Sequence, residues 1–310
     1  MTPPDALATQ SKESLAPAGA HVGPAELDVV PDVSDRRRSW SKYLSIFRVS
    51  LKERMTYRGD FLLGTILRFL PMVTTILLWQ AIYKGSGQSE LGNADVKFDY
   101  KEMIAYLLLT NISRMFSSMP GLAGGIAREI REGTMKRYLV QPIDMVGYLL
   151  VYRIAHKVTD IIMSFIPYAL LFFLCRDFYA GFPDALTMAA FAISLVLAFL
   201  VGFFFELSVG MVGFWFLEVT SVLYIVMTLN FFISGHMLPL DLLPEPWASF
   251  LKLLPFQYMA YFPAVVFQGK VQGLTLVKYL LAELFWAVFF MVLARGLYRL
   301  GLRRYSAFGG

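Results

Sequence analysis

The densest group of charged side chains lies in residues 124–147, between two strongly apolar runs. Six charged side chains of both signs fall within ten positions of this segment: Arg128, Glu129, Arg131, Glu132, Lys136 and Arg137. Ile126 and Ile130 lie one helical turn apart, which predicts a short amphipathic helix with an apolar stripe and a charged face. Such a face could recognise a soluble partner through ion pairs and hydrogen bonds. The alternative is a solvated loop of mixed charge.

The same segment contains signals for a second short helix. Gly133 interrupts the helical pattern, Thr134 can cap a new helix, and Pro142 ends it. We therefore predict two short helices joined by a bend at Gly133.

Groups that could catalyse a reaction are few. The chain has three histidines and one cysteine, Cys175, and it contains no HExxH or GxSxG motif. A membrane enzyme would need a convergent catalytic set, which this sequence does not offer. The phosphate-binding motif G-x-x-x-x-G-K-[ST] is also absent, because the Gly269–Lys270 pair is followed by Val271. We expect no metal and no cofactor bound by this chain, and no ATP hydrolysis by the chain alone.

The composition is typical of a membrane protein with several spans. Hydrophobic residues make up 57% of the 310 positions and charged residues only 16%. The net charge of +5 comes from basic residues that flank apolar runs, so membrane orientation explains them and nucleic-acid binding is not indicated. One cysteine excludes an internal disulfide.

The predicted fold is all-α with six transmembrane helices. Six apolar runs approach the roughly 20 residues that span a bilayer: 61–83, 102–123, 148–175, 185–205, 215–234 and 274–297. Residues 36–60 predict an amphipathic helix at the membrane interface, because Trp40 and Tyr43 recur at helical spacing beside basic residues. Residues 1–35 are rich in proline without apolar periodicity, which predicts a disordered tail, and residues 305–310 form a C-terminal tail.

Five ionisable residues are candidates for polar groups within the membrane or at its boundary: Arg114, Asp160, Glu206, Glu218 and Glu283. Arg114 is expected to face other helices or a water-filled cavity. Asp160 follows His156 and Lys157 on one helical side, so these groups can neutralise one another. A proton relay through His156 is the functional alternative to a plain helix contact.

A cytoplasmic hinge is predicted after the fourth run. Glu206 and Glu218 flank it, and Gly210 and Gly213 lie within it. The two carboxylates could respond to coupling motions, or they could be solvated structural groups.

Residues 235–272 are too apolar for an ordinary exposed loop. Five prolines break any single spanning helix there: Pro239, Pro244, Pro246, Pro255 and Pro263. Non-helical backbone at membrane depth must be buried in protein or line a cavity. We therefore predict two short helices that re-enter the membrane from outside.

Basic residues orient the chain. Arg36, Arg37 and Arg38 precede the first run, and Arg299, Arg303 and Arg304 follow the last. The positive-inside rule then places both termini and the 124–147 loop in the cytoplasm.

Two stretches resemble motifs of type-2 ATP-binding-cassette (ABC) exporter permeases. Arg131-Glu132-Gly133-Thr134, followed by Leu139 and Pro142, is similar to the "RE-x-G-T…L…P" pattern of their first cytoplasmic loop. Ser234-Gly235, followed by Pro239, Leu243-Pro244 and Leu254-Pro255-Phe256, is similar to their "SG…P…LP…P" signature after the fifth span. The resemblance covers residues 40–304.

The resemblance implies a permease domain at residues 61–304, driven by a separate ABC ATPase that binds ATP and magnesium. It implies that the ATPase is coupled through the first cytoplasmic loop, by Arg128, Arg131, Glu132, Gly133, Thr134, Lys136, Arg137 and Pro142. A second permease chain, identical or related, would complete the transporter in the bacterial plasma membrane, with spans one, two and five at the interface and pathway.

The sequence leaves alternatives open for the transported substrate and for the transport mechanism. The aromatic runs Phe203 to Phe205 and Phe214 to Phe216 favour a hydrophobic or amphipathic cargo. The alternative is that these rings face lipid or pack between helices. Export follows from the resemblance alone. A secondary transporter usually has an internal repeat, which we do not find. A structural membrane subunit without ATP coupling would keep the same apolar runs.

Overall fold

The computed structural model describes residues 33–56, 58–93, 96–140, 143–179, 181–216 and 218–305. Most of the predicted tail at residues 1–35, the C-terminal residues 306–310 and Pro142 lie outside the described residues. The chain divides into two compact units, residues 1–42 and residues 43–310, and the contacts described below lie within the second unit.

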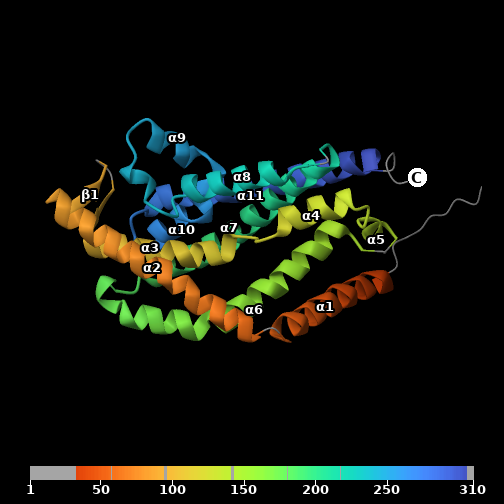
Figure 1. Cartoon of the computed structure of the whole chain (residues 1–310), viewed down its shortest axis with the longest axis horizontal. Coiled ribbons are helices and arrows are strands. Elements are labelled where there is room, and N and C mark those ends of the chain that lie inside the picture. The colour runs from red at the N-terminus through yellow and green to blue at the C-terminus, as the bar shows by residue number, and fades with distance from the viewer. Residues whose placement is uncertain are drawn as a thin grey trace, which may run out of the picture. The chain divides into compact units, whose positions relative to one another are not determined.

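The described chain is a series of helices with one small hairpin (Figure 1). The longer helices are α1 Val33–Thr56, α2 Arg58–Ser86, α3 Tyr100–Ser117, α4 Leu122–Arg131, α6 Met145–Leu174, α7 Ala185–Met211, α8 Thr220–Ile233 and α11 Gly273–Tyr305. The short helices are α5 Lys136–Leu139, α9 Trp247–Leu253 and α10 Tyr261–Phe267, with single 3₁₀ turns η1 Arg176–Phe178, η2 Val212–Phe214, η3 Leu240–Leu242 and η4 Pro255–Met259.

The prediction of an all-α fold is wrong in one detail. Strands β1, Glu90–Gly92, and β2, Lys97–Asp99, form an antiparallel hairpin between α2 and α3. The hairpin ends at Asp99, whose side chain accepts a 2.7 Å hydrogen bond from the Glu102 N–H and so caps α3. Each strand has only three residues, which is too short for period-2 alternation to mark it in the sequence.

Three helices of the described chain are long and apolar enough to cross a membrane: α6, the helix α7 with η2, and α11. The six-span count therefore remains a prediction. Helix α3 contains the charged Lys101, Glu102 and Arg114. Helix α8 has 14 residues, which is about 21 Å of helix against roughly 30 Å of bilayer core.

Helix α7 is the centre of the packing. It contacts α3, α4, α10 and α11, and Ala198, Val201, Phe203 and Leu207 along it are fully buried. Phe204 and Phe205 are buried as well. These three rings therefore fill the core around α7, which is the packing role that the sequence left open, and they offer no surface to a cargo.

The predicted hinge between Glu206 and Glu218 begins later in the chain than expected. Helix α7 continues through Glu206 and Gly210 to Met211 and only then tightens into η2. A Cβ on Gly210 would lie 2.9 Å from the Ala123 carbonyl oxygen of α4. The glycines thus permit close helix packing here, rather than breaking the helix.

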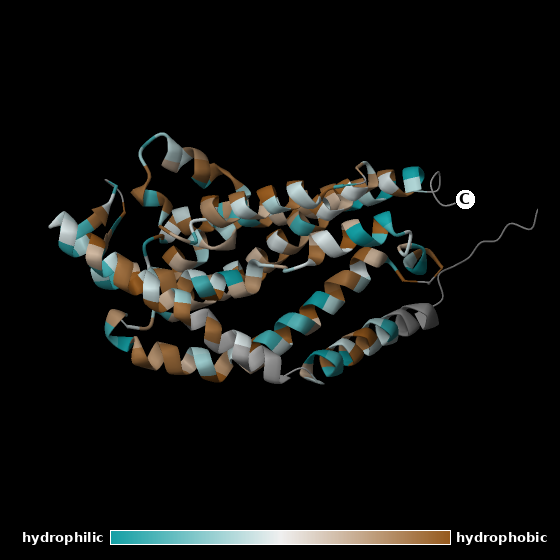
Figure 2. Ribbon diagram, in the orientation of Figure 1, coloured by the Kyte–Doolittle hydropathy of each residue, from teal (hydrophilic) through white to brown (hydrophobic). Residues whose placement is uncertain are grey.

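The segment 235–272 contains the two expected short helices, α9 and α10, joined by η4. Tyr258, Met259, Ala260, Phe262 and Val265 are almost completely buried. Burial within protein accounts for the apolar character of this irregular segment, and its depth in a membrane remains a prediction. Figure 2 shows hydrophilic residues on α4 and α5 and hydrophobic ones along the C-terminal half of α6.

Candidate functional site

Helix α4 is positioned by its apolar stripe. Gly121 stands at its N-cap position with a φ of 76°, a left-handed conformation that favours glycine. Leu122, Ile126 and Ile130 are buried at four-residue spacing. Ala127 meets η2, where a Cβ on Gly213 would lie 3.1 Å from the Ala127 Cα atom. One face of α4 is thus packed against the end of α7, which confirms the amphipathic helix expected from the sequence.

Helix α5 folds back against α4 around a bend at Gly133, whose φ is 71°. Arg137 forms an ion pair with Glu129 and donates a 2.8 Å hydrogen bond from Nη2 to the Tyr138 hydroxyl. The Tyr138 ring is buried, and burial raises the pKa of its hydroxyl to about 12. These contacts hold the two short helices as one unit, which we call the α4–α5 hairpin, residues 122–139.

Thr134 does not cap the second helix as predicted. Its hydroxyl donates a 3.4 Å hydrogen bond to the Glu129 carbonyl oxygen, and no side chain caps the start of α5. Met135, which is fully buried, stands at the cap position.

The outer face of the α4–α5 hairpin carries mixed charge. Its exposed polar side chains are Arg128, Arg131, Glu132, Thr134, Lys136 and Arg137. Beside them, a groove of about 550 Å³ is lined by Trp215, Phe216, Arg304 and Tyr305. Charged residues of both signs and aromatic rings therefore share one accessible surface.

One residue of this face is tied to α8. Arg131 Nη1 lies 3.2 Å from Glu218 Oε2. Glu218 Oε1 accepts a 2.9 Å hydrogen bond from the Thr220 N–H at the start of α8. The hydrogen bonds from Thr220, together with the Arg131 guanidinium, lower the pKa of the Glu218 carboxyl. Glu218 is thus an exposed carboxylate that connects the end of α4 to the start of α8.

The joint between α3 and α4, residues 118–121, is held by three ionisable side chains. Glu206 Oε1 accepts from the Met119 N–H at 3.1 Å, Arg153 Nη1 donates to the Pro120 carbonyl at 3.2 Å, and Lys157 Nζ donates to the Ser118 carbonyl at 2.7 Å. Cations at the C-terminal end of a helix satisfy its last carbonyls and oppose its dipole. The Oε2 atom of Glu206 is buried, so Glu206 is not a solvated group, which was one of the two alternatives that the sequence left open.

The remaining ionisable candidates lie between helices. Asp160 lies 3.7 Å from Arg54 of α1, so it has a partner outside its own helix that the sequence did not indicate. Arg114 has one guanidinium nitrogen buried, as its expected position between helices requires. Glu283 is completely buried in α11, and neither of its oxygens has a hydrogen-bond partner among the described residues.

The second motif builds a turn after α8. Ser234 is fully buried, and its carbonyl accepts from the Tyr261 N–H at 3.1 Å. Gly235 has a φ of 78°, and a Cβ there would lie 2.7 Å from the Tyr261 Cβ, so glycine is required. Pro239 precedes η3, Pro244 accepts the Trp247 N–H, and Pro255 begins η4. The motif residues within 234–255 therefore shape the backbone.

Sequence reasoning missed a buried network in the same region. Asp241 accepts a 2.7 Å hydrogen bond from the Tyr261 hydroxyl and lies 2.5 Å from Lys252 Nζ. Asp241 is 1% exposed. An isolated acidic residue within the apolar stretch LPLDLLP was the available signal, because a buried carboxylate needs a partner.

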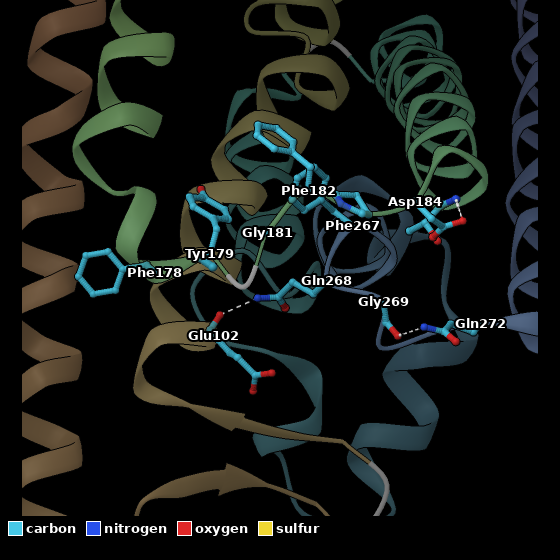
Figure 3. A pocket seen from close by; sticks show the side chains of 13 residues that line it. Glu102, Phe178, Tyr179, Gly181, Phe182, Asp184, Phe267, Gln268, Gly269 and Gln272 are labelled. Carbon is cyan, nitrogen blue, oxygen red and sulfur yellow. Dashed lines mark hydrogen bonds between the residues drawn. The ribbon is translucent and has the colours of Figure 1, made fainter.

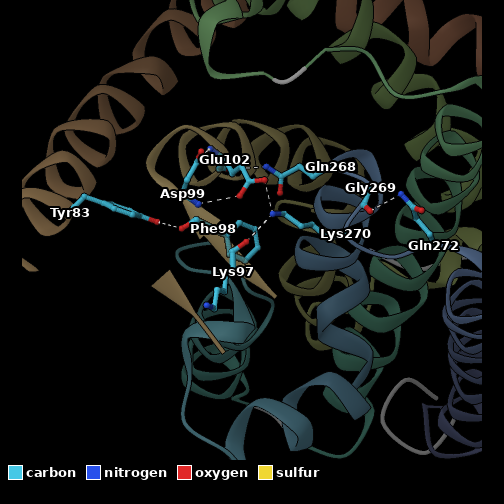
Figure 4. Close-up of polar contacts among 9 residues, drawn as sticks. All are labelled: Tyr83, Lys97, Phe98, Asp99, Glu102, Gln268, Gly269, Lys270 and Gln272. Atoms are coloured by element: carbon cyan, nitrogen blue, oxygen red, sulfur yellow. Dashed lines mark hydrogen bonds and ion pairs between the residues drawn. The ribbon is translucent and has the colours of Figure 1, made fainter. Parts of the chain in front are cut away.

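The N-terminal end of α3 carries a further polar cluster (Figure 4). Lys270 Nζ lies 2.7 Å from Glu102 Oε1, and Gln268 Nε2 donates at 2.7 Å to the Glu102 carbonyl. Gln268, Tyr179 and Phe267 also line a cavity of about 250 Å³ next to the start of α7 (Figure 3). These bonds connect the start of α3, which follows the β1–β2 hairpin, to the segment between α10 and α11.

Comparison with known proteins identifies the family. No curated protein matches the chain. The family described as ABC-2 family transporter protein matches residues 69–309, which include the α4–α5 hairpin and the 234–255 motif. Its members are membrane subunits that work with an ABC ATPase in a lipid bilayer. This match over most of the chain shows that the chain belongs to the ABC-2 transporter family.

Proposed function

We propose that this chain is the permease subunit of an ABC exporter and that a separate ATPase subunit binds the outer face of the α4–α5 hairpin. The observation that carries the proposal is the division of that hairpin into a buried apolar face and an exposed charged face. A soluble domain can reach Arg128, Glu132 and Lys136, while the buried stripe transmits any displacement to α7. ATP and magnesium would bind to the ATPase.

Coupling requires an element whose position differs between two states of the ATPase. The hairpin has two routes into the rest of the protein. Its apolar face packs against α7 and η2, and Arg131 connects it to the start of α8 through Glu218. A movement of the hairpin would therefore shift α8, which belongs to the fifth apolar run.

The proposed path for the cargo lies beside α2, α3 and α8. A cavity of about 460 Å³ there is lined by Met72, Trp79, Leu107, Asn111 and His236, among others. This apolar lining with a few polar groups suits a hydrophobic or amphipathic molecule. A second permease chain, the same or related, would face this side, and both termini would lie in the cytoplasm of a bacterial cell.

The first test is co-purification of the solubilised chain with its ATPase. Glu132→Lys reverses one exposed charge of the hairpin, and we expect at least tenfold less ATPase to be recovered. Asp177→Lys, which reverses an exposed charge in η1, is the matched control and should recover as much ATPase as the unmodified chain. Equal recovery with Glu132→Lys would refute the proposed contact.

Transport by the reconstituted complex separates the remaining alternatives. ATP-dependent export that stops with an inactive ATPase supports the exporter. Transport driven by an ion gradient without ATP would indicate a secondary transporter, and no transport by an intact complex would indicate a structural subunit.

A further inference from the structure

The groove of about 550 Å³ beside the α4–α5 hairpin lies where three parts of the chain meet. Its lining comes from the hairpin, from η2 with the two residues after it, and from the last turn of α11, and includes Glu132, Gly133, Trp215, Phe216, Arg304 and Tyr305. We call it the aromatic groove. The ATPase contact proposed above uses only the first of these three parts.

The last turn of α11 is packed against both of the other parts. The rings of Phe214 and Tyr305 meet edge to face, with their centroids 6.1 Å apart. A Cβ on Gly301 would collide with the Phe214 ring, and a Cβ on Gly133 would lie 3.8 Å from the Tyr305 hydroxyl oxygen. The aromatic groove is therefore formed by elements in close contact.

Two aromatic residues of the groove are held in place by their backbone. The N–H groups of Trp215 and Phe216 donate to the Val212 carbonyl at 3.0 Å and 3.3 Å. The Phe216 side chain is nevertheless 62% exposed. A ring in a fixed position loses little conformational freedom on binding and buries a large apolar area, so such residues often anchor protein interfaces.

The neighbouring charges indicate that a protein covers this ring. Glu132 and Arg304 are exposed and line the same groove. Phe216 precedes the exposed Glu218, which lies outside the apolar helix α8. Arg304 forms no ion pair in the described part of the chain, so a carboxylate on the occupant would find a partner there. An apolar centre surrounded by charged residues is typical of an interface between proteins.

We propose that the ATPase subunit inserts an apolar side chain, with a carboxylate beside it, into the aromatic groove. The apolar side chain contacts Trp215 and Phe216, and the carboxylate pairs with Arg304. This inference rests on the proposed function, because Glu132 belongs both to the groove and to the outer face of the hairpin. It adds α11, a candidate membrane span, to the surface that the ATPase touches.

Co-purification of the solubilised complex tests both contacts. Phe216→Ser should lower the recovery of ATPase about tenfold, the effect of removing an aromatic anchor, and Arg304→Glu should lower it by a similar factor. The matched controls are Phe182→Ser, which changes an 89% exposed ring, and Arg299→Glu, which reverses an exposed cation of α11. Neither control residue lines the groove, and both variants should recover as much ATPase as the unmodified chain. Equal losses for Arg304→Glu and Arg299→Glu would show general charge attraction and overturn the site.

Misfolding is excluded by the apparent melting temperature of each variant in detergent. The four changed side chains are exposed, so all four melting temperatures should match that of the unmodified chain.

The occupant is identified by cross-linking within the complex. The photoreactive residue p-benzoylphenylalanine in place of Phe216 should cross-link to the ATPase, at a peptide in which an apolar residue lies next to Asp or Glu. The same residue in place of Phe182 should give no such product. Cross-linking at Phe216 to lipid or to a second permease chain, with none to the ATPase, would overturn the proposal.

Glu132→Lys separates this inference from the proposed function. Loss of ATPase with Glu132→Lys but full recovery with Phe216→Ser and Arg304→Glu would refute the groove and leave the hairpin contact standing. Full recovery with all three variants would refute both. Loss with Phe216→Ser and Arg304→Glu alone would support the groove and count against the outer face of the hairpin as the contact.

Discussion

Arg131 Nη1 lies 3.2 Å from Glu218 Oε2, which ties the last turn of α4 to the start of α8 although 87 positions separate the two residues. The side chains are 46% and 65% exposed. Exposed ion pairs contribute only about 0–1 kcal/mol to folding. The pair therefore matters for the relative position of α4 and α8. Its loss should affect the coupling of ATP hydrolysis to transport more than the folding stability.

Reversal of Arg131 should uncouple ATP hydrolysis from transport. Arg131→Glu places two carboxylates side by side, so we expect at least tenfold slower ATP-driven transport with a change in unfolding free energy below about 1 kcal/mol. The double variant Arg131→Glu/Glu218→Arg restores opposite charges and should recover most of the transport. A double variant that is worse than either single one would show that the pair is not the connection.

The contribution of the Glu218 carboxylate to folding stability should not depend on pH across the neutral range. Hydrogen bonds from Thr220 and the charge of Arg131 lower the pKa of Glu218 below its ordinary value of 4.5. A lowered folded-state pKa means that the stabilisation is fully present above the unfolded value and is lost as the pH falls through the folded value. The difference in apparent melting temperature between the unmodified chain and Glu218→Gln should stay constant from pH 8 to pH 5. A difference that shrinks between pH 8 and pH 6 would contradict the lowered pKa.

Gly202→Ala should disrupt the packing of α3 on α7. A Cβ on Gly202 would lie 1.9 Å from the Ser117 carbonyl oxygen, so the backbones must separate. Overpacking of this kind costs about 1–3 kcal/mol, and the apparent melting temperature in detergent should fall. Gly296→Ala in α11 is the control, because a Cβ there meets nothing within 4 Å and should be neutral or slightly stabilising. Equal melting temperatures for the two variants would contradict the close contact.

Removal of the Asp241 carboxylate should destabilise the segment 235–272. Asp241→Ala leaves Lys252 and the Tyr261 hydroxyl without their partner, and loss of one member of a buried pair costs on the order of 3 kcal/mol. Tyr261→Phe removes one hydrogen bond and should cost about 1 kcal/mol. Faster limited proteolysis between α9 and α10 would report the local loss of stability. Equal resistance to proteolysis of the unmodified chain, Asp241→Ala and Tyr261→Phe would show that this network does not stabilise the segment 235–272.

The sequence alone determined the features that depend on local chemistry. The spacing of Ile126 and Ile130 predicted the amphipathic α4, and Gly133 predicted the bend. The two motifs indicated the family, because each is a short run of residues that can be read directly along the chain. The prolines of residues 235–272 indicated short helices, because a residue without an N–H cannot continue a long one.

The tertiary structure alone decided which distant charges meet. Asp160 contacts Arg54 of α1, Glu206 bonds the α3–α4 joint, and Arg131 reaches Glu218. The packing of α4 against Gly210 likewise kept α7 helical where glycines suggested a hinge. Each of these contacts joins residues distant along the chain, and helical periodicity describes only neighbours three or four positions apart. Charge partners and close backbone contacts of this kind arise only when the helices are packed together.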